Sequence, residues 1–259
     1  MTTDKSIGFV GAGRVARILL EGLQRQSALP AKITVYDANP EATKALKAIV
    51  PTLEIAAASA TAAAQDIVFL AVHPPAMVEM AAGIKGQLKP EGVAVSLAPK
   101  FTIAKLGELL GGFNRLARCI PNAPSLIGAG YNPMTFAPAL GTADKADLTE
   151  LLQPLGDCPE VDEAKLEAYA ILSAMGPTYL WFQLQTLREV AADLGLTDAD
   201  ITPALKRTVC GATRTLLESE LTPAEVINLI PVKPLAEMEA PVAEMYRTRL
   251  PGLYQRIKP

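Results

Sequence analysis

The first 120 residues alternate short apolar runs with segments of helical periodicity. The apolar runs predict β-strands over residues 7–10, 33–36, 67–72, 93–97 and 115–120. Helical patterns occupy residues 14–25, 40–49 and 102–110. Strands that alternate with helices at this spacing form βαβ units, so the pattern predicts a parallel sheet. The run over residues 67–72 is apolar throughout, which is typical of a strand buried on both faces of such a sheet.

The alternation stops near Asp157, and from Asp162 onward the patterns are almost entirely helical. The predicted helices cover residues 163–172, 178–194, 198–220 and 235–254. We therefore expect an α/β N-terminal domain with a parallel sheet over residues 1–157, followed by an all-α C-terminal domain over residues 158–259.

The composition excludes several classes of protein. The 259 residues are 50% hydrophobic and 20% charged, so the chain can bury a full core. With 24 basic and 27 acidic residues the net charge is −3, which leaves no basic surplus to neutralise nucleic-acid phosphates. Cys119, Cys158 and Cys210 stand far apart and His73 is the sole histidine, so we expect no metal site and a reducing, cytoplasmic location. The uncharged run over residues 168–187 contains a Gly-Pro pair, which favours a buried helix over a membrane span.

The turn after the first strand carries a phosphate-binding pattern. Its residues are Gly11-Ala12-Gly13-Arg14-Val15-Ala16, or GxGxxA, between a predicted strand and a predicted helix. Gly11 permits a tight turn, Gly13 lets a pyrophosphate approach the backbone, and Ala16 lets the helix pack close to the sheet. The helix N-terminus then offers free N–H groups to the phosphates. The motif predicts a dinucleotide-binding domain.

Asp37 ends the second predicted strand, where ribose recognition occurs in such a domain. A carboxylate there accepts a hydrogen bond from a ribose 2′-hydroxyl and repels a 2′-phosphate, which favours NAD(H). Lys44 keeps NADP(H) open as the cofactor. The alternative is that Asp37 only caps the following helix.

Five stretches of the chain resemble, in order, motifs of the pyrroline-5-carboxylate reductase family. They lie at residues 7–13, 70–74, 96–103, 118–124 and 172–179. The fourth, Arg-Cys-Ile-Pro-Asn-Ala-Pro, is similar to the family's Arg-x-Met-Pro-Asn-Thr-Pro, and the fifth, Leu-Ser-Ala-Met-Gly-Pro-Thr-Tyr, to its Leu-Ser-Gly-Ser-Gly-Pro-Ala-Tyr. The resemblance runs from about residue 6 to residue 226.

The resemblance implies a Rossmann-type domain, a helical domain that forms an intertwined homodimer or a higher oligomer, and reduction of the C=N bond of a cyclic imino acid by NAD(P)H to give proline. Asn122 and Ser173 are then the candidate catalytic residues near the nicotinamide. The implied dinucleotide contacts are Gly11, Gly13, Arg14, Val15, Asp37, Ala71, Val72, His73 and Pro74.

The chain departs from the family pattern mainly on the substrate side. His73 replaces a lysine, and Lys100 stands where the family has a glycine. The family's Ser-Pro-Gly-Gly-Thr-Thr substrate loop corresponds to residues 230–237, Ile-Pro-Val-Lys-Pro-Leu-Ala-Glu. Because proline has no N–H, this segment cannot form the same nest of donors. Lys100 and Lys233 could each attract a substrate carboxylate or simply be solvated.

Three functions follow from these observations. The first is a pyrroline-5-carboxylate reductase or a related imine reductase. The second is another Rossmann oxidoreductase of similar build, with a ketone, another imine or a deazaflavin as its reaction partner. The third is a non-catalytic dinucleotide-binding sensor of redox state. The Asn-x-Pro and Gly-Pro motifs argue against a sensor, which needs no substrate crevice, and we favour the first.

Overall fold

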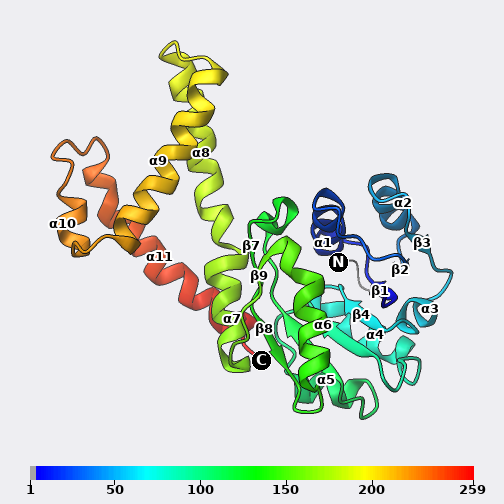
Figure 1. Cartoon of the computed structure of the whole chain (residues 1–259). Coiled ribbons are helices and arrows are strands. Elements are labelled where there is room, and N and C mark those ends of the chain that lie inside the picture. The colour runs from blue at the N-terminus through cyan, green and yellow to red at the C-terminus, as the bar shows by residue number, and fades with distance from the viewer. Residues whose placement is uncertain (1–3) are drawn as a thin grey trace. The chain divides into compact units, whose positions relative to one another are not determined.

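The computed structural model describes residues 4–259 of the chain, which form two compact units (Figure 1). The first unit runs to Met175 and includes the C-terminal segment Leu253–Pro259, and the second is Gly176–Gly252. The first unit holds the sheets, and the second is helical.

The first unit is built on a largely parallel sheet. Within residues 4–259 the sheet has seven strands in the order β3-β2-β1-β4-β5-β6-β8, and every neighbouring pair is parallel except β6 with β8. A second, two-stranded sheet pairs β7 with β9. The strands are β1 Ile7–Val10, β2 Ile33–Tyr36, β3 Glu54–Ile55, β4 Ile67–Leu70, β5 Val93–Ser96, β6 Leu116–Cys119, β7 Gly130–Tyr131, β8 Met134–Phe136 and β9 Gly156–Asp157.

Helices connect the strands and then form the second unit. The helices of the first unit are α1 Arg14–Arg25, α2 Pro40–Ile49, α3 Ser59–Ala63, α4 Met77–Ile84, α5 Ile103–Leu109, α6 Thr142–Leu152 and α7 Leu166–Tyr169. Those that follow are α8 Gly176–Asp193, α9 Asp198–Glu218, α10 Pro223–Ile227 and α11 Ala236–Ile257, the last of which ends inside the first unit. Short 3-10 turns lie at Pro74–Ala76, Ala123–Ile127, Gln153–Leu155 and Glu163–Lys165, and one turn of π-helix at Ala170–Ala174.

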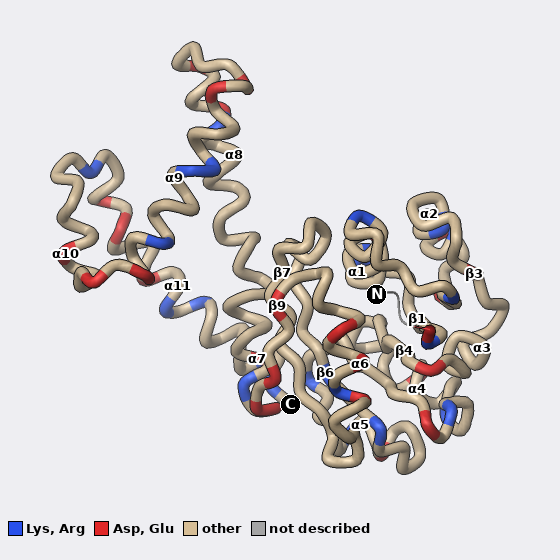
Figure 2. The backbone as a smooth tube through the Cα atoms, in the orientation of Figure 1, with Lys and Arg blue, Asp and Glu red and all other residues tan. Residues whose placement is uncertain are grey.

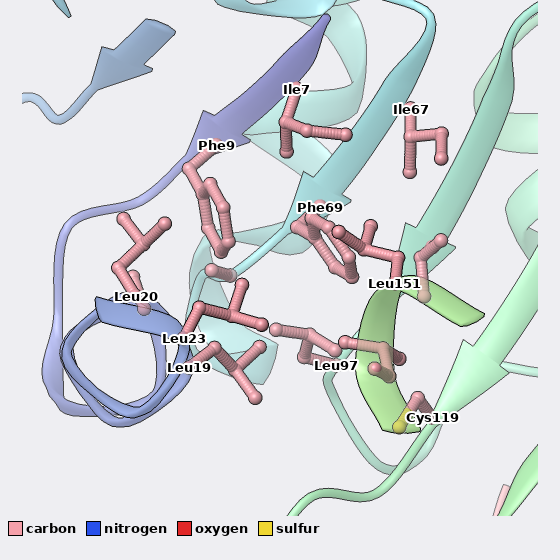
Figure 3. Packing of buried hydrophobic residues seen from close by; sticks show 14 of the residues in the cluster. Ile7, Phe9, Leu19, Leu20, Leu23, Ile67, Phe69, Leu97, Cys119 and Leu151 are labelled. Carbon is pink, nitrogen blue, oxygen red and sulfur yellow. The ribbon is translucent and has the colours of Figure 1, made fainter. Parts of the chain in front are cut away.

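One face of the main sheet packs against α1, α2 and α6. Alternate residues of a strand point to opposite faces, so Ile7 and Phe9 of β1 share this face with Phe69 of β4. Figure 3 shows these side chains turned toward the leucines of α1. The rings of Phe9 and Phe69 stack with their centroids 4.7 Å apart. Burial of each such side chain contributes about 1.5–3 kcal/mol, which fixes α1 against the sheet.

The other face of the sheet packs against α3, α4 and α5. Val10 of β1, together with Val68 and Leu70 of β4, contributes to this second core. The helices supply Ala62, Ala63, Met77, Met80, Ala81, Ile84 and Leu106. Helices therefore cover both faces, and the apolar run over residues 67–72 reflects burial of β4 on both sides.

The predicted fold class is confirmed. The strands predicted over residues 7–10 and 33–36 have the observed bounds, and the three others lose one or two residues at their ends. The features that were not predicted include β3, α3 and α4, the antiparallel β8, the small sheet of β7 and β9, and α6. The buried residues of α6 are Leu148, Leu151 and Leu152, all in its second half, so its amphipathic pattern is short.

The segment after β9 belongs to the compact unit that contains the sheet. Leu166 and Ala170 form a small core with Ile120 and Ile257, against which Leu253 also packs. The compact units thus divide at Met175, whereas the predicted division at residue 157 rested on the change from alternating elements to helices alone. That residues 1–157 bind the cofactor and residues 158–259 contribute to substrate binding stays a prediction. No helix within residues 4–259 is long and apolar enough to cross a membrane.

Candidate functional site

The candidate site lies at one edge of the main sheet. Strands β1, β4, β5 and β6 are parallel neighbours, so the loops that follow them meet at their common carboxyl edge. These loops hold Gly11, His73, Lys100 and Asn122. Chain order reverses between β1 and β4, because β2 and β3 lie on the other side of β1. Such a switch point opens a crevice in which open α/β sheets bind ligands.

Gly11 makes the turn after β1 possible. Its φ is +109°, a conformation that disfavours any residue with a Cβ. A Cβ at this position would lie 2.4 Å from the Ala71 carbonyl oxygen. The Gly11 N–H donates to the Tyr36 carbonyl, with N and O 2.7 Å apart. Close approach of the β1 and β4 ends therefore requires glycine here.

Gly13 leaves room for a ligand at the start of α1. It is exposed, and a Cβ added to it would meet no atom of the described residues within 4 Å. No side chain caps α1, and its first turn contains no acidic residue. The N–H groups at Arg14 and Val15 thus begin an uncapped helix, where a phosphate group is favoured by the helix dipole. The open space and the free donors fit a dinucleotide pyrophosphate.

Asp37 ties the glycine turn to the end of β2. Its Oδ2 accepts the Ala12 N–H at 2.7 Å, and its Oδ1 accepts the Asn39 N–H at 2.8 Å. The cap of α2 is Asn39, whose side chain accepts the Glu41 N–H. Asp37 is therefore not the cap residue of that helix, and each of its oxygens keeps acceptor capacity for a ribose hydroxyl. Lys44, the residue that kept NADP(H) open as the cofactor, forms an ion pair with Glu41, with Nζ and Oε1 2.8 Å apart.

The end of β4 forms the next part of the edge. Ala71 is buried and donates its N–H to the Val10 carbonyl at 2.8 Å. Val72 is half-buried, and His73 is exposed just before the 3-10 turn Pro74–Ala76. Ala71 and Val72 lie beside Gly11, and the dinucleotide contacts expected at residues 71–74 stay a prediction.

Asn122 fixes the loop after β6 through both ends of its amide. Its Oδ1 accepts the Tyr131 N–H at 3.1 Å, and its Nδ2 donates to the Ser173 carbonyl at 3.3 Å. Its own N–H donates to Asn132 Oδ1 at 3.2 Å. The two predicted catalytic residues are therefore adjacent, and the Asn122 side chain is largely committed to holding loops together.

Ser173 lies in the single turn of π-helix, Ala170–Ala174. This turn is closed by the bond from the Met175 N–H to the Ala170 carbonyl, with N and O 3.0 Å apart. Ser173 Oγ donates to the Tyr169 carbonyl at 2.8 Å, so its oxygen remains free to accept a hydrogen bond. Such π-turns interrupt α-helices mostly at functional sites.

A buried ion cluster joins the elements that carry the candidate site residues. Arg118 of β6 is fully buried, and its guanidinium donates to Glu167 and, at 3.1 Å, to Glu163. Glu163 also accepts the Ile103 N–H at 2.6 Å, and Glu167 accepts the Lys100 N–H at 3.3 Å. The cluster therefore links β6, α7 and the loop between β5 and α5.

The sequence analysis did not identify this ion cluster as part of the site. A signal for it was present, because Arg118 interrupts an otherwise apolar strand and a buried arginine requires acidic partners. Glu163 and Glu167 are four residues apart, a spacing that places both on one helical face. The sequence pattern does not show which acids pair with Arg118, because Glu163 and Glu167 lie 45 and 49 residues away along the chain.

The cysteines show no feature of a reactive or metal site. Burial raises the pKa of the Cys119 thiol well above its ordinary value and that of Cys158 to about 11, so both are protonated at neutral pH. None of the three cysteines is in a disulfide. In the part of the chain that the structure describes, no group of three or more His, Cys, Asp and Glu side chains is arranged to hold a metal ion.

We predict that Gly13→Val abolishes dinucleotide binding without unfolding the protein. The valine side chain fits the empty protein but occupies the space that the pyrophosphate needs. Isothermal titration with NADH and NADPH should show at least a 100-fold loss of affinity, and thermal unfolding should change little. Gly11→Ala is the contrast, because it should lower the melting temperature. Retained affinity in Gly13→Val contradicts the assignment of this turn.

Comparison with known proteins identifies the family. A family model described as NADP oxidoreductase, coenzyme F420-dependent, matches residues 6–99. Pyrroline-5-carboxylate reductase of Pseudomonas aeruginosa is 31% identical over 228 residues, 87% of this chain and 83% of that protein.

Two solved structures have the same fold over almost the whole chain. A pyrroline-5-carboxylate reductase from Coxiella burnetii has a TM-score of 0.70 at 25% identity, covering 98% of this chain and 95% of its own. The pyrroline carboxylate reductase of Plasmodium falciparum with NADP bound has a TM-score of 0.76 at 19% identity, covering 99% and 95%. The resemblance seen in the five sequence motifs is confirmed, and this chain belongs to the pyrroline-5-carboxylate reductase family.

Proposed function

We propose that this protein reduces the C=N bond of pyrroline-5-carboxylate with NAD(P)H to form proline. The observation that carries the proposal is the 31% identity to a pyrroline-5-carboxylate reductase over most of both chains. The geometry of the glycine turn adds support, because it fits the dinucleotide that this reaction consumes. The match to the F420-dependent family model covers only residues 6–99, the nucleotide-binding part, and therefore does not select another substrate.

The protein's part in this reaction is to bind and orient. A bound NAD(P)H supplies the hydride, and the imine carbon accepts it while the nitrogen keeps the proton of the protonated imine. Gly11, Gly13, Arg14 and Val15 would hold the pyrophosphate, and Asp37 the adenosine ribose. The residues after β4, 71–74, would line the path of the dinucleotide along the edge. Because the protonated imine is already electrophilic, no strong general acid is required, and positioning supplies most of the rate.

Ser173 and Asn122 would act at the imine end of the site. Ser173 Oγ already donates to the Tyr169 carbonyl, so toward the substrate it would accept, which suits the N–H of a protonated imine. Asn122 would act through Ser173, since its amide donates to the Ser173 carbonyl and holds the π-turn in place. His73 would contact the cofactor rather than transfer a proton.

For the cofactor we propose a preference for NADH over NADPH. The Asp37 carboxylate is half-buried at the end of β2 and hydrogen-bonded to the glycine turn. A 2′-phosphate beside it would meet the negative charge of Asp37, and Lys44 of the following helix is paired with Glu41.

We also propose that the protein forms a homodimer through its helical unit. Within Gly176–Gly252, large apolar side chains are exposed, including Trp181, Phe182, Leu194 and Leu217. Charged residues are spread along α9 and α11 (Figure 2). Exposed apolar surface on this scale marks an interaction site, and a second copy of the same unit would cover it. The cytoplasmic location expected from the cysteines stays a prediction.

The proposed activity predicts rapid NADH oxidation with pyrroline-5-carboxylate as the acceptor. Absorbance at the reduced-nicotinamide band should fall only when both substrates are present, and proline should accumulate in equal amount. Gly13→Val is the matched inactive control. Cofactor binding without turnover would contradict the proposed substrate and would direct attention to other imines and to ketones that carry an acid group.

The cofactor proposal predicts that Asp37→Ser raises the NADPH-to-NADH ratio of kcat/KM by at least 10-fold, because the repelling charge is gone. Asp37→Asn is the control for the structural bond, since its amide oxygen can still accept the Ala12 N–H. Steady-state kinetics with both cofactors measure the ratio. An unchanged ratio in both variants would show that Asp37 only braces the glycine turn.

The dimer proposal predicts a particle of twice the chain mass in sedimentation velocity. Leu217→Glu should shift the particle toward monomer, because it places a charge on the apolar surface, where Leu217 is 74% exposed. Gln24→Glu, at an exposed position of α1, is the control and should leave the dimer intact. A monomeric wild-type protein would refute the proposal.

A further inference from the structure

Lys100 has a backbone conformation that lysine disfavours. Its φ is +77°, and Ser27 is the other non-glycine residue within residues 4–259 with a positive φ. Backbone strain of this kind persists only when the surrounding structure holds it, and it clusters at functional sites.

The loop that carries Lys100 is fixed at two backbone positions. The Lys100 N–H donates to Glu167 Oε1 at 3.3 Å, and the Ile103 N–H donates to Glu163 Oε1 at 2.6 Å. Both glutamates are bound by the buried Arg118. The loop between β5 and α5 is thus tied to the ion cluster at the strained residue itself and three residues later, and it cannot relax without losing these hydrogen bonds.

The Lys100 side chain is exposed and its ammonium group is free. Several other lysines of this unit pair with acids: Lys89 with Asp66 at 2.6 Å, Lys105 with Glu108 at 2.9 Å and Lys145 with Glu160 at 2.5 Å. No ion pair or hydrogen bond joins the Lys100 ammonium to any residue between 4 and 259. The charge is therefore available to a ligand.

Lys100 is also the one lysine or arginine in the loops that leave β1, β4, β5 and β6 at the site edge. These loops are residues 11–13, 71–76, 97–102 and 120–133, and they contain no aspartate or glutamate. Arg14 begins α1 after the first of them, next to the pyrophosphate position. Since β5 is two strands from β1, Lys100 lies about 10 Å further along the edge, on the side of Asn122.

We propose that Lys100 binds the carboxylate of the imino-acid substrate. The inference rests on the proposed function, whose substrate is a small ring with one carboxylate. An unpaired ammonium is attracted to such a group as a point charge. The strained backbone places that charge at the crevice, and the Arg118 cluster keeps it there. Pro231 and Pro234 of the helical unit have no N–H, so they cannot supply the equivalent donors from the backbone.

The test compares two substrates that share the ring and the C=N bond, pyrroline-5-carboxylate and 1-pyrroline, which lacks the carboxylate. Lys100→Met should raise KM for pyrroline-5-carboxylate about 10-fold or more with kcat changed less than 3-fold, while both constants for 1-pyrroline stay unchanged. Lys100→Gly should behave alike although it relieves the strained backbone, and Lys100→Arg should recover part of the affinity. Lys105→Met, at an exposed position of α5 where the lysine pairs with Glu108, is the matched control and should have no effect. Lys233→Met tests the alternative cation.

An equal loss for both substrates in Lys100→Met, or an effect in Lys233→Met alone, would overturn the proposal. If the wild-type protein reduces neither imine, the proposed function fails. A binding measurement then tests separately whether Lys100 binds a carboxylate. In isothermal titration of the NAD(P)-loaded protein with pyrrole-2-carboxylate, Lys100→Met should bind at least 10-fold more weakly than the wild type. Equal binding, or no binding to the wild type, would refute the assignment.

Discussion

The buried guanidinium of Arg118 is the constraint on which the site depends. It is fully enclosed, its partner Glu167 is 2% exposed, and the same two glutamates accept backbone N–H groups from the loop after β5. Removing one partner of such a cluster costs about 3–5 kcal/mol, because an uncompensated charge stays buried. The cluster therefore holds three pieces in one arrangement: β6, the loop that carries Lys100, and α7 with the π-turn that carries Ser173.

The two ends of the site use different kinds of chemistry. At β1 and β4 the groups available to a ligand belong to the backbone, since Gly11 permits the turn and the uncapped start of α1 supplies N–H groups. At the other end the candidate groups are side chains: Lys100 and Asn122 lie on the loops after β5 and β6, and Ser173 lies in the π-turn after α7. A backbone site can bind the same cofactor in many relatives, whereas a side-chain site changes with single substitutions.

Most of the fold could be predicted from the sequence because hydrophobic periodicity reports local burial. The strands over residues 7–10 and 33–36 and the helix from Pro40 to Ile49 have clear patterns and clear ends. The partners of Arg118 could not be predicted, because periodicity carries no information about contacts 45 or more residues apart. The positive φ of Lys100 had one signal in the sequence, because Lys100 stands where the family has a glycine, but no positive φ was predicted from it. The glycine turn between β1 and α1 could be predicted because its pattern lies within six consecutive residues.

The central claim is that the carboxyl edge of this sheet brings a reduced nicotinamide to a C=N bond, and isotope transfer tests it most directly. The protein would be incubated with pyrroline-5-carboxylate and NADH deuterated on the nicotinamide carbon that gives up the hydride, prepared as each stereoisomer in turn. The account predicts proline with one deuterium, at the carbon that was doubly bonded to nitrogen, from one of the two stereoisomers. Proline without deuterium from both, or no proline while the cofactor binds, would contradict it.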